Sequence, residues 1–405
     1  MSQTKPVTIL AIAGYEKGHA FLRQAKQEGA RVLLLTSQSL KDTAQFPRDS
    51  LDDIFYMPDV DKQWNREDTL KAVSYLARTE AIDRIVPLDD FDLELAAYLR
   101  EHLRIPGLGE SSTRYFRDKL AMRMKAEEAG LSIPPFVHVL NHRRIAEYLE
   151  RVPGPWVLKP RLMAGAIGIK KIASALELWP ILEQMGDEQS YYLLEKYIPG
   201  DVYHVDSIVY EREIKFAVAS GYGRPPMDVS HEGGVFTSRI LERGSAVEQQ
   251  LLAKNRQVLA ALGLVRGVSH TEYIVGREDG KVYFLETSAR VGGAHIAELI
   301  EFATGINMWG EWAKVEIAGG TGKYVLPAPR KDYAGLLVCL ARQEHPDTSA
   351  YNDPEIVWRM DKKNHVGLVV QAPLYARVQE LLDSYTNRAV QDFLAIAPPK
   401  GRPTD

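Results

Sequence analysis

Two glutamates and an arginine lie close together in the segment HTEYIVGREDGKVYFLETSARVGGAHI (residues 270–296). Two predicted strands, separated by the turn EDG, form a hairpin that can bring Glu272 and Glu286 to one place. Converging carboxylates are costly unless a cation neutralises them, and Mg²⁺ commonly binds one or two carboxylates together with substrate phosphates. Arg290 could stabilise charge on a transferring phosphoryl group, and Gly292-Gly293 precede a predicted helix start, which favours anions. Each residue alone fits a solvated hairpin with salt bridges, but the whole set favours a metal and phosphate site.

A loop in the segment WVLKPRLMAGAIGIKKI (residues 156–172) has the composition of a phosphate-binding loop. The first strand ends at Lys159, and Gly165 and Gly168 lie among small residues before the second strand. Backbone N–H groups of such a loop can close over phosphate oxygens while Lys159 supplies a positive charge. The Walker sequence GK[ST] is missing, so this is a different kind of loop. By itself the segment fits an ordinary hairpin with a surface lysine equally well.

The segment YYLLEKYIPGDVYHVDSIV (residues 191–209) predicts a strand, a Pro-Gly turn and a second strand. The extended stretch after Glu195 could offer backbone N–H and C=O groups to an adenine edge, with Ile198 packed on the ring. Taken alone, a β-turn with an exposed Glu-Lys pair explains this segment better. His204 and Asp206 alternate along one face of the second strand, where they could reach a nucleotide or only bind each other.

The elements that must position these residues begin with a predicted parallel sheet. Short apolar runs alternate with helical patterns in the order Val7–Ala13 (strand), His19–Glu28 (helix), Arg31–Thr36 (strand), Asp68–Arg78 (helix) and Arg84–Leu88 (strand). This alternation favours a parallel sheet because parallel neighbours need a crossover. Further elements are predicted at Thr113–Gly130 (helix), Phe136–Val139 (strand), Ala334–Ala341 (strand), Val366–Gln371 (strand) and Leu374–Tyr385 (helix), followed by a disordered tail, PPKGRPTD.

Composition excludes several classes of protein. A chain of 405 residues with 45% hydrophobic residues predicts two or three domains with real cores. Lys and Arg number 50 and Asp and Glu 54, and this net charge of −4 argues against a nucleic-acid partner. The single cysteine, Cys339, excludes a disulfide framework and a multi-cysteine metal site. No apolar run reaches the length of a spanning helix, so we expect a soluble, cytoplasmic protein without a membrane partner.

The motifs also form an ordered series along the chain. Lys119 in DKLAMRMKAEEAGLSIPP is followed by VLKP, EKYIPG, HTEY and LETSARVGG. This series resembles that of the ATP-grasp superfamily over roughly residues 1–320, and the 14-residue step from Glu272 to Glu286 is similar to the family's metal pair. Within the superfamily the chain looks like the carboxylate–amine ligases that join amino acids into dipeptides and related amides, the L-amino acid ligase or dipeptide synthetase type.

The resemblance implies an α/β protein with α+β lobes, the ATP-grasp fold. Its parts are a Rossmann-like parallel α/β domain (1–112), the A lobe of the nucleotide-binding core (113–190), the B lobe with the metal site (191–325), and a C-terminal α+β cap with its tail (326–405).

The same resemblance implies a role for each motif residue. The residues implied to bind ATP are Lys119 and Lys159 on the phosphates, Gly165 and Gly168 in the mobile loop, and Glu195, Tyr197 and Ile198 in the adenine hinge. Glu272 and Glu286 match the Mg²⁺ ligands, and Arg290 matches the arginine beside the transferred phosphoryl group. The implied cofactors are ATP and Mg²⁺, expected as two ions, with Mn²⁺ as a substitute.

Two positions depart from the family pattern. Ser288 stands where the family has an asparagine metal ligand, and its hydroxyl is a weaker oxygen ligand. Val202 stands where a ribose-binding glutamate is expected, so Asp201 or another group must bind the hydroxyls. The family's acyl-acceptor region includes His231, a candidate for binding or deprotonating substrate, although an ordinary loop histidine is an equally good explanation. The residues implied to lie at the acyl pocket are Gly292, Gly293, Ala294, whose small side chain leaves that part open, and His295.

The resemblance therefore implies an ATP-dependent ligase that forms an amide or dipeptide bond through an acyl phosphate and releases ADP and phosphate. Its small-molecule partners are a carboxylate and an amine, both expected to be amino acids, and a homodimer is the default assembly. Two alternatives stay open. One is an ATP-grasp enzyme of the purine-pathway or carboxylase type that uses formate or bicarbonate, and the other is a non-catalytic nucleotide-binding module.

Overall fold

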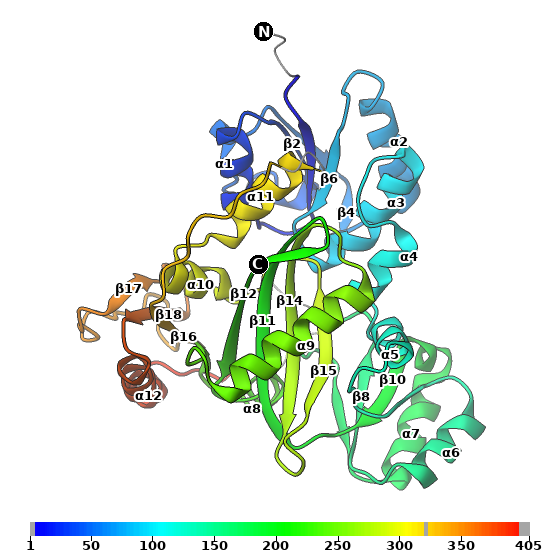
Figure 1. Cartoon of the computed structure of the whole chain (residues 1–405). Helices are drawn as coiled ribbons and strands as arrows, with labels where there is room; N and C mark the ends of the chain where they lie inside the picture. The colour runs from blue at the N-terminus through cyan, green and yellow to red at the C-terminus, as the bar shows by residue number, and fades with distance from the viewer. Residues whose placement is uncertain (1–4, 320–322, 397–405) are drawn as a thin grey trace.

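Three β-sheets of four or more strands, each covered by helices, build the chain in the computed structural model, which describes residues 5–319 and 323–396 (Figure 1). The predicted disordered tail, PPKGRPTD, lies outside the described residues. Within the described ranges, no helix has both the length and the apolar character that a membrane crossing requires.

The first sheet is parallel, as the alternation of strands and helices predicted. Its strand order is β3-β2-β1-β6, formed by β1 (Thr8–Ala13), β2 (Arg31–Ser37), β3 (Asp53–Met57) and β6 (Arg84–Pro87). The helices of this part are α1 (His19–Gln27), α2 (Arg66–Leu76) and α3 (Leu93–Leu103), and β4 (Asp59–Val60) pairs with β5 (Gln63–Trp64) in a small ribbon. Each predicted element of this region is therefore present, with ends shifted by one or two residues.

A short helical connection leads from the first sheet to the second. It contains α4 (Glu110–Thr113), a 3₁₀ turn at Arg114–Phe116 and α5 (Lys119–Glu128). The continuous helix predicted from Thr113 to Gly130 was wrong, because Asp118 leaves the helical conformation and its side chain accepts hydrogen bonds from the backbone N–H groups of Leu120 and Ala121. An N-cap of this kind begins a new helix at Lys119.

The second sheet is small and antiparallel, with strand order β7-β10-β8-β9. It consists of β7 (Phe136–His138), β8 (Trp156–Pro160), β9 (Lys170–Ile172) and β10 (Tyr192–Lys196), and it packs on α6 (His142–Arg151) and α7 (Ala175–Met185). The resemblance placed the boundary between the A and B lobes after residue 190, yet β10 lies between β7 and β8 and belongs to this sheet.

The third sheet has eight strands in the order β15-β14-β11-β12-β13-β16-β18-β17. The strands are β11 (Gly200–Tyr210), β12 (Glu213–Tyr222), β13 (Phe236–Ile240), β14 (Gly267–Gly276), β15 (Val282–Ser288), β16 (Tyr333–Leu340), β17 (Ile356–Arg359) and β18 (His365–Ala372). The helices of this part are α8 (Pro226–Glu232), α9 (Ala246–Leu262), α10 (Ile296–Thr304), α11 (Met308–Ala318) and α12 (Tyr375–Asp392). Because β16 pairs with β13, the C-terminal strands extend the sheet that carries the glutamate hairpin.

One hydrophobic core joins the first sheet to the third. It contains Phe21 of α1, Trp312 of α11 and Leu336 of β16, and the rings of Phe21 and Trp312 lie 5.4 Å apart in an edge-to-face contact. Figure 1 shows α11 against the N-terminal region, although the two are far apart in sequence. This packing holds the loop after β6 beside the carboxyl end of β15, where the candidate site lies.

Candidate active site

Two adjoining pockets share a wall that contains Glu272 and Glu286. The first pocket, of about 910 Å³ and partly open to solvent, lies between the second and third sheets. The second, of about 1130 Å³, lies between the third sheet and the loop after β6. Gly165 and Pro226 also line both pockets. A molecule in the first pocket can therefore react with one in the second across the two carboxylates.

The register of β14 and β15 sets the two glutamates opposite each other, as the hairpin prediction required. The Tyr222 hydroxyl donates a hydrogen bond of 2.7 Å to Oε1 of Glu272, and Lys119 Nζ lies 2.8 Å from Oε2 of Glu286. The other oxygen of each carboxylate, Oε2 of Glu272 and Oε1 of Glu286, accepts no hydrogen bond from any residue in 5–319 or 323–396. Two open carboxylate oxygens on a pocket wall fit a divalent cation such as Mg²⁺.

Burial and neighbouring charges oppose each other at Glu272. Burial by itself would raise the pKa of Glu272, but the hydrogen bond and charge of His270 and the hydrogen bond from Tyr222 outweigh burial and lower the pKa to about 2. Burial would likewise lower the pKa of His270, whereas Asp206 and Glu272 raise it to about 9. Both side chains are therefore charged at neutral pH.

A buried ion-pair cluster forms one wall of the first pocket. Glu195 is 2% exposed, and its carboxylate receives Arg123 Nε at 2.9 Å and forms an ion pair with Lys159. Burial would raise the pKa of Glu195, but the charges of Arg123 and Lys159 lower it. Glu195 thus holds Lys159 at the pocket, and the fully buried Arg123 is a site residue that the sequence analysis missed.

The predicted hinge lies along the same pocket. Tyr197 and Ile198 line it together with Val202 and Ile274, which makes an apolar slot suited to a flat ring. Lys171 Nζ lies 3.9 Å from the centre of the Tyr197 ring, a cation–π contact. Asp201, proposed for the ribose hydroxyls, is exposed, does not line the pocket, and pairs with Arg277 at 2.7 Å.

The predicted phosphate loop covers the junction between the pockets. Gly165 lines both of them and has a φ of 67°, and the next residue, Ala166, has a φ of 59°. Gly168 does not line either pocket, and a Cβ atom there would lie 2.9 Å from the ring of Pro160. Gly168 has a φ of 73°, and the left-handed backbone at Gly165 and Gly168 explains the two glycines.

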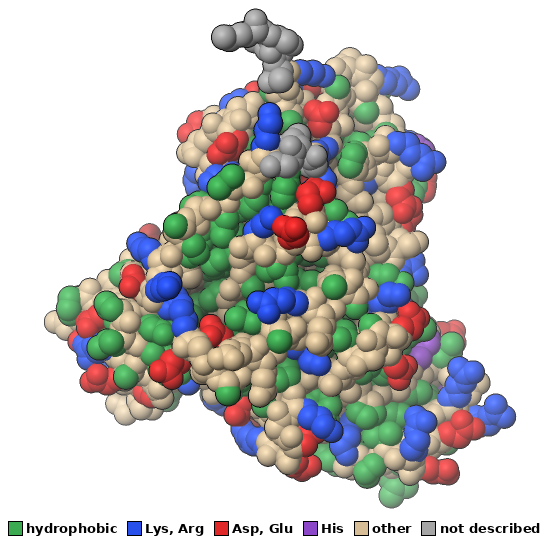
Figure 2. Space-filling model, viewed as in Figure 1, with side chains coloured by type: hydrophobic (Ala, Val, Ile, Leu, Met, Phe, Trp, Pro, Cys, Tyr) green, Lys and Arg blue, Asp and Glu red, His purple; other side chains and the backbone are tan. Residues whose placement is uncertain are grey.

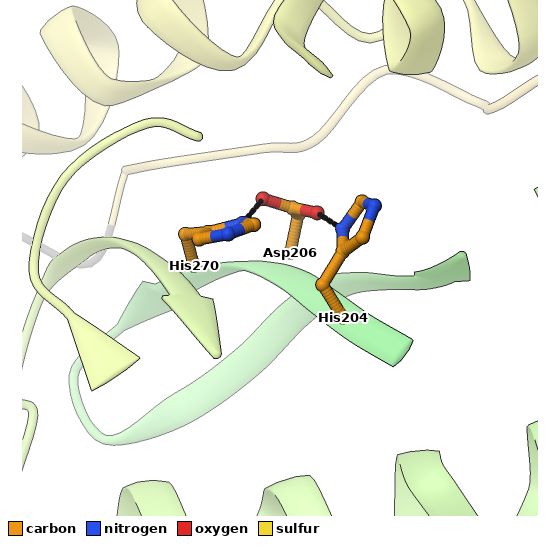
Figure 3. A group of neighbouring side chains, drawn as sticks. All are labelled: His204, Asp206 and His270. Carbon is orange, nitrogen blue, oxygen red and sulfur yellow. Dashed lines mark hydrogen bonds and ion pairs between the residues drawn. The ribbon is translucent and has the colours of Figure 1, made fainter. Parts of the chain in front are cut away.

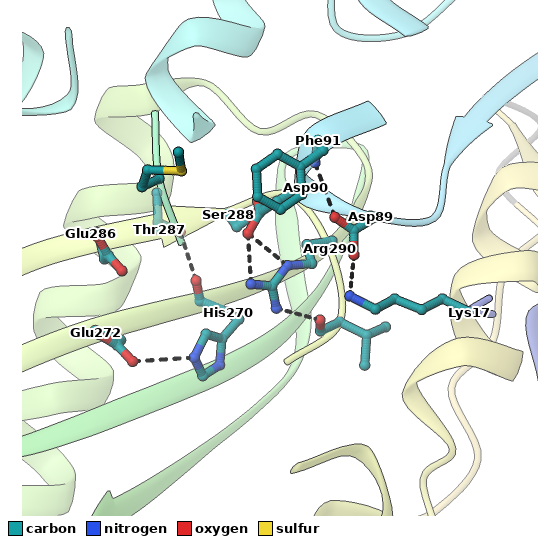
Figure 4. Close-up of polar contacts among 12 residues, drawn as sticks. Lys17, Asp89, Asp90, Phe91, His270, Glu272, Glu286, Thr287, Ser288 and Arg290 are labelled. Carbon is teal, nitrogen blue, oxygen red and sulfur yellow. Dashed lines mark hydrogen bonds and ion pairs between the residues drawn. The ribbon is translucent and has the colours of Figure 1, made fainter. Parts of the chain in front are cut away.

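In the second pocket, Arg290 is paired with an aspartate of the N-terminal region (Figure 4). Arg290 Nε and Nη2 donate to Oδ2 of Asp90 at 2.9 and 2.6 Å, and the Ser288 hydroxyl donates to Oδ1 of the same carboxylate. The neighbouring Asp89 pairs with Lys17. Asp89, Asp90 and Lys17 were missed because no sequence motif links the loop after β6 to a hairpin some 200 residues away.

The loop that follows Arg290 has residues on both sides of the pocket wall. Gly293 and Ala294 line the second pocket, and a Cβ atom on Gly293 would meet nothing within 4 Å. Gly292 lies behind them, where a Cβ atom would lie 3.0 Å from Nδ1 of His270. His295 packs on Trp358 with ring centres 4.7 Å apart and does not line the pocket. His231 is exposed near the end of α8, outside the lining of both pockets.

Charges of both signs are interspersed on the described part of the face in Figure 2, without a wide basic patch.

Comparisons with known proteins identify relatives of the chain. No protein-family model matches the chain. The L-arginine-specific L-amino acid ligase of Bacillus subtilis is 26% identical over 233 residues, which cover 56% of this chain and 56% of that protein. Carnosine synthase 1 of Gallus gallus is 23% identical over 364 residues, or 84% of this chain and 38% of that protein. The matched segments thus span little more than half, or less, of these curated relatives.

Solved structures resemble the chain over nearly its whole length. An L-amino acid ligase from Bacillus licheniformis has a TM-score of 0.77 at 16% identity, covering 97% of this chain and 99% of its own. An N5-carboxyaminoimidazole ribonucleotide synthetase, crystallised as an ADP complex, has a TM-score of 0.70 at 15% identity, covering 97% of this chain and 100% of its own. Because these neighbours are ATP-grasp enzymes, the chain has the ATP-grasp fold that its motif series predicted.

Proposed function

We propose that this chain is an ATP-dependent carboxylate–amine ligase that forms an amide bond, as between two amino acids, and releases ADP and phosphate. The observation that carries the proposal is the shared wall of the two pockets, where Glu272 and Glu286 lie between a slot suited to a nucleotide and a second chamber. The curated relatives, which include an L-amino acid ligase and a carnosine synthase, support amino acids as the substrate class.

In the first pocket, the apolar slot at Tyr197 and Ile198 would hold the adenine ring, and Lys159 and the backbone around Gly165 would bind the phosphates. Val202 lines the slot without a carboxylate, so we assign no side chain to the ribose hydroxyls.

Glu272 and Glu286 would hold Mg²⁺, for which their open oxygens are suitable ligands. The ion would neutralise phosphate charge between the pockets. Ser288 donates to Asp90, and so it would have to rotate to offer its hydroxyl oxygen to a cation.

The second pocket would bind the acid and the amine. The acid's carboxylate attacks the γ-phosphorus, the bond to ADP breaks, and an acyl phosphate forms. The amine nitrogen then attacks the acyl carbon, phosphate leaves, and the amine loses a proton. Arg290 would stabilise the transferring phosphoryl group, and Gly293 and Ala294 would leave room for the acyl chain. We give His231 no part in these steps because it is exposed outside both pockets.

The test is phosphate release from Mg-ATP with paired amino acids, followed by mass analysis of the product. We expect ADP and phosphate that depend on both an acid and an amine. Arg290→Ala should abolish turnover and leave nucleotide binding largely intact, whereas Arg377→Ala, in a C-terminal ion-pair cluster, should not change turnover. AMP and pyrophosphate as products would overturn the proposal.

A second candidate rests on the structural likeness to the carboxyaminoimidazole ribonucleotide synthetases, with TM-scores of 0.69 to 0.72. Turnover stimulated by bicarbonate, with no response to amino acids, would support that candidate. ATP binding without turnover over the whole amino-acid panel would instead support a non-catalytic nucleotide-binding module.

A further inference from the structure

A buried polar chain lies directly behind Glu272, on the same face of the third sheet. In the register of β11 and β14, His204 lies opposite Glu272 and Asp206 lies opposite His270. Figure 3 shows His204 and His270 on either side of the Asp206 carboxylate. His204 is 0% exposed, Asp206 is 1% exposed and His270 is 9% exposed. The two strands therefore place three buried polar side chains directly behind Glu272.

The hydrogen bonds among these buried side chains have a fixed direction. Asp206 Oδ2 lies 2.6 Å from Nδ1 of His204, and Oδ1 lies 2.9 Å from Nδ1 of His270. Because an ionised carboxylate can only accept, both imidazoles must donate from Nδ1. His204 Nε2 is bound by the Ser238 hydroxyl at 2.8 Å. The other nitrogen of His270, Nε2, therefore faces Glu272, with Oε1 at 3.6 Å.

Tyr222 completes the arrangement around the same oxygen of Glu272. Its hydroxyl donates to Oε1 at 2.7 Å and lies 3.4 Å from Nε2 of His270, and its ring packs on His204 with centres 4.8 Å apart. Oε1 thus lies beside the hydrogen-bonding groups of Tyr222 and His270, whereas Oε2 is open to the pocket. The carboxylate is held in one orientation from behind.

The side chains of His204, Asp206 and His270 leave no room for a metal ion among them. The ligand atoms of His204, Asp206 and His270 lie within 4.8 Å of one another, which is a spacing that a metal could bridge. However, both oxygens of Asp206 already accept hydrogen bonds, and Gly292 covers the group so closely that a Cβ atom would lie 3.1 Å from Oδ1. The role of these residues is therefore carried by their hydrogen bonds.

We propose that Tyr222, His270 and Asp206 are positioning residues that fix Glu272 so that it offers a single oxygen, Oε2, to a divalent cation. Asp206 orients His270, and His270 and Tyr222 together hold Oε1. The inference rests on the proposed metal role of Glu272 and adds to it the residues that set the coordination mode. Groups that orient a metal ligand in this way commonly change metal affinity by about 10- to 100-fold when they are removed.

The first test compares two substitutions that each remove one buried hydroxyl. Tyr222→Phe removes the hydroxyl that donates to Glu272. The control, Tyr273→Phe, lies on the same strand as Glu272 and removes a hydroxyl that donates to Asn255 over 2.9 Å. Binding of Mn²⁺ is measured by electron paramagnetic resonance with a non-hydrolysable ATP analogue present. We expect Tyr222→Phe to raise the Mn²⁺ Kd about tenfold, and Tyr273→Phe to leave it unchanged. Equal Kd values in the two variants would overturn the proposal.

A second test follows the direction of the hydrogen bonds. Asp206→Asn offers one accepting oxygen and one donating nitrogen, so one imidazole must give up its proton at Nδ1. We expect the ¹⁵N spectrum of the histidine side chains to show that one imidazole has lost its Nδ1 proton in the metal-free protein, assigned with His204→Gln and His270→Gln. An Nδ1 proton retained on both imidazoles in a folded Asp206→Asn variant would overturn the orientation of His270 by Asp206.

Glu272→Gln separates this inference from the proposed function. If Glu272→Gln leaves Mn²⁺ binding unchanged, then the metal role of Glu272 is wrong and the positioning inference fails with it. If Glu272→Gln abolishes binding while Tyr222→Phe behaves like Tyr273→Phe, then only the positioning inference fails.

Discussion

The ion pair between Asp90 and Arg290 joins the N-terminal region to the loop after β15, beside the hydrogen bond from Ser288 to the same carboxylate. The Asp90 side chain is 10% exposed and that of Arg290 is 17% exposed, and two nitrogens of the guanidinium lie within 2.9 Å of Oδ2. Removing one partner of a buried pair leaves the other charge unpaired and costs about 3–5 kcal/mol. Since water in the second pocket can reach Arg290, we expect Asp90→Ala to cost about 3 kcal/mol, the lower end of that range.

The assay is a double-mutant cycle in guanidinium chloride. The free energies of unfolding of Asp90→Ala, Arg290→Ala and the double variant are compared with that of the parent chain. We expect the double variant to lose about 2 kcal/mol less than the sum of the single losses, because the two residues act through one contact. The free energies are used where fluorescence and circular dichroism give one coincident transition.

The same pair has a defined pH dependence. Burial would raise the pKa of Asp90, but the charges of Arg290 and Arg117 outweigh burial and hold the pKa well below its usual range. A lowered pKa in the folded state means that the stabilisation is present above the unfolded pKa of about 3.9 and is lost as the pH falls through the folded pKa. The coupling should therefore stay constant between about pH 5 and 8. A coupling near zero at pH 7, or one that changes across this window, would refute the reasoning.

Three further predictions concern the loop after Arg290 and the single cysteine. Gly292→Ala should destabilise the fold by about 1–3 kcal/mol, because its Cβ would lie 3.0 Å from both His270 and Ile296, and thermal unfolding measures this. Gly293→Ala should change the free energy of unfolding by less than about 0.5 kcal/mol but raise the KM of the acid, because it adds a methyl group to the second pocket. An unchanged KM would contradict the placement of the acid beside Gly293. Burial raises the pKa of the Cys339 thiol to about 11. Iodoacetamide should therefore modify the native protein at least 100-fold more slowly than the unfolded protein at pH 8, and a rate near that of a free thiol would contradict this.

The sequence by itself determined the local elements and the residue types of the site. The alternation of apolar runs predicted the parallel sheet of β1, β2 and β6, because a strand and its crossover helix leave their periodicity in a short stretch of chain. The hairpin of Glu272 and Glu286 was predictable for the same reason, since the turn between β14 and β15 brings the two together through local pairing. The motif series then indicated the ATP-grasp fold, which the structural neighbours confirm.

Sequence reasoning was weaker where one side chain decides an element. The helix predicted through Asp118 divides there because a single carboxylate caps two backbone N–H groups, a choice that apolar periodicity does not register. The roles given to Asp201 and His231 came from their order in the motif series, whereas their exposure follows from neighbours that the order does not specify.

Tertiary structure alone decided which distant groups complete the site. Asp90 meets Arg290 because the packing of α1 on α11 holds the first sheet against the third, and no local signal records that contact. The buried cluster of Arg123 with Glu195, and the chain from Asp206 to Glu272, likewise join side chains from different elements. A charge in the interior is stable only with a partner, and the packing of whole sheets decides which side chain is that partner. The reactive groups could therefore be predicted from the sequence, whereas the groups that hold them were found only in the fold.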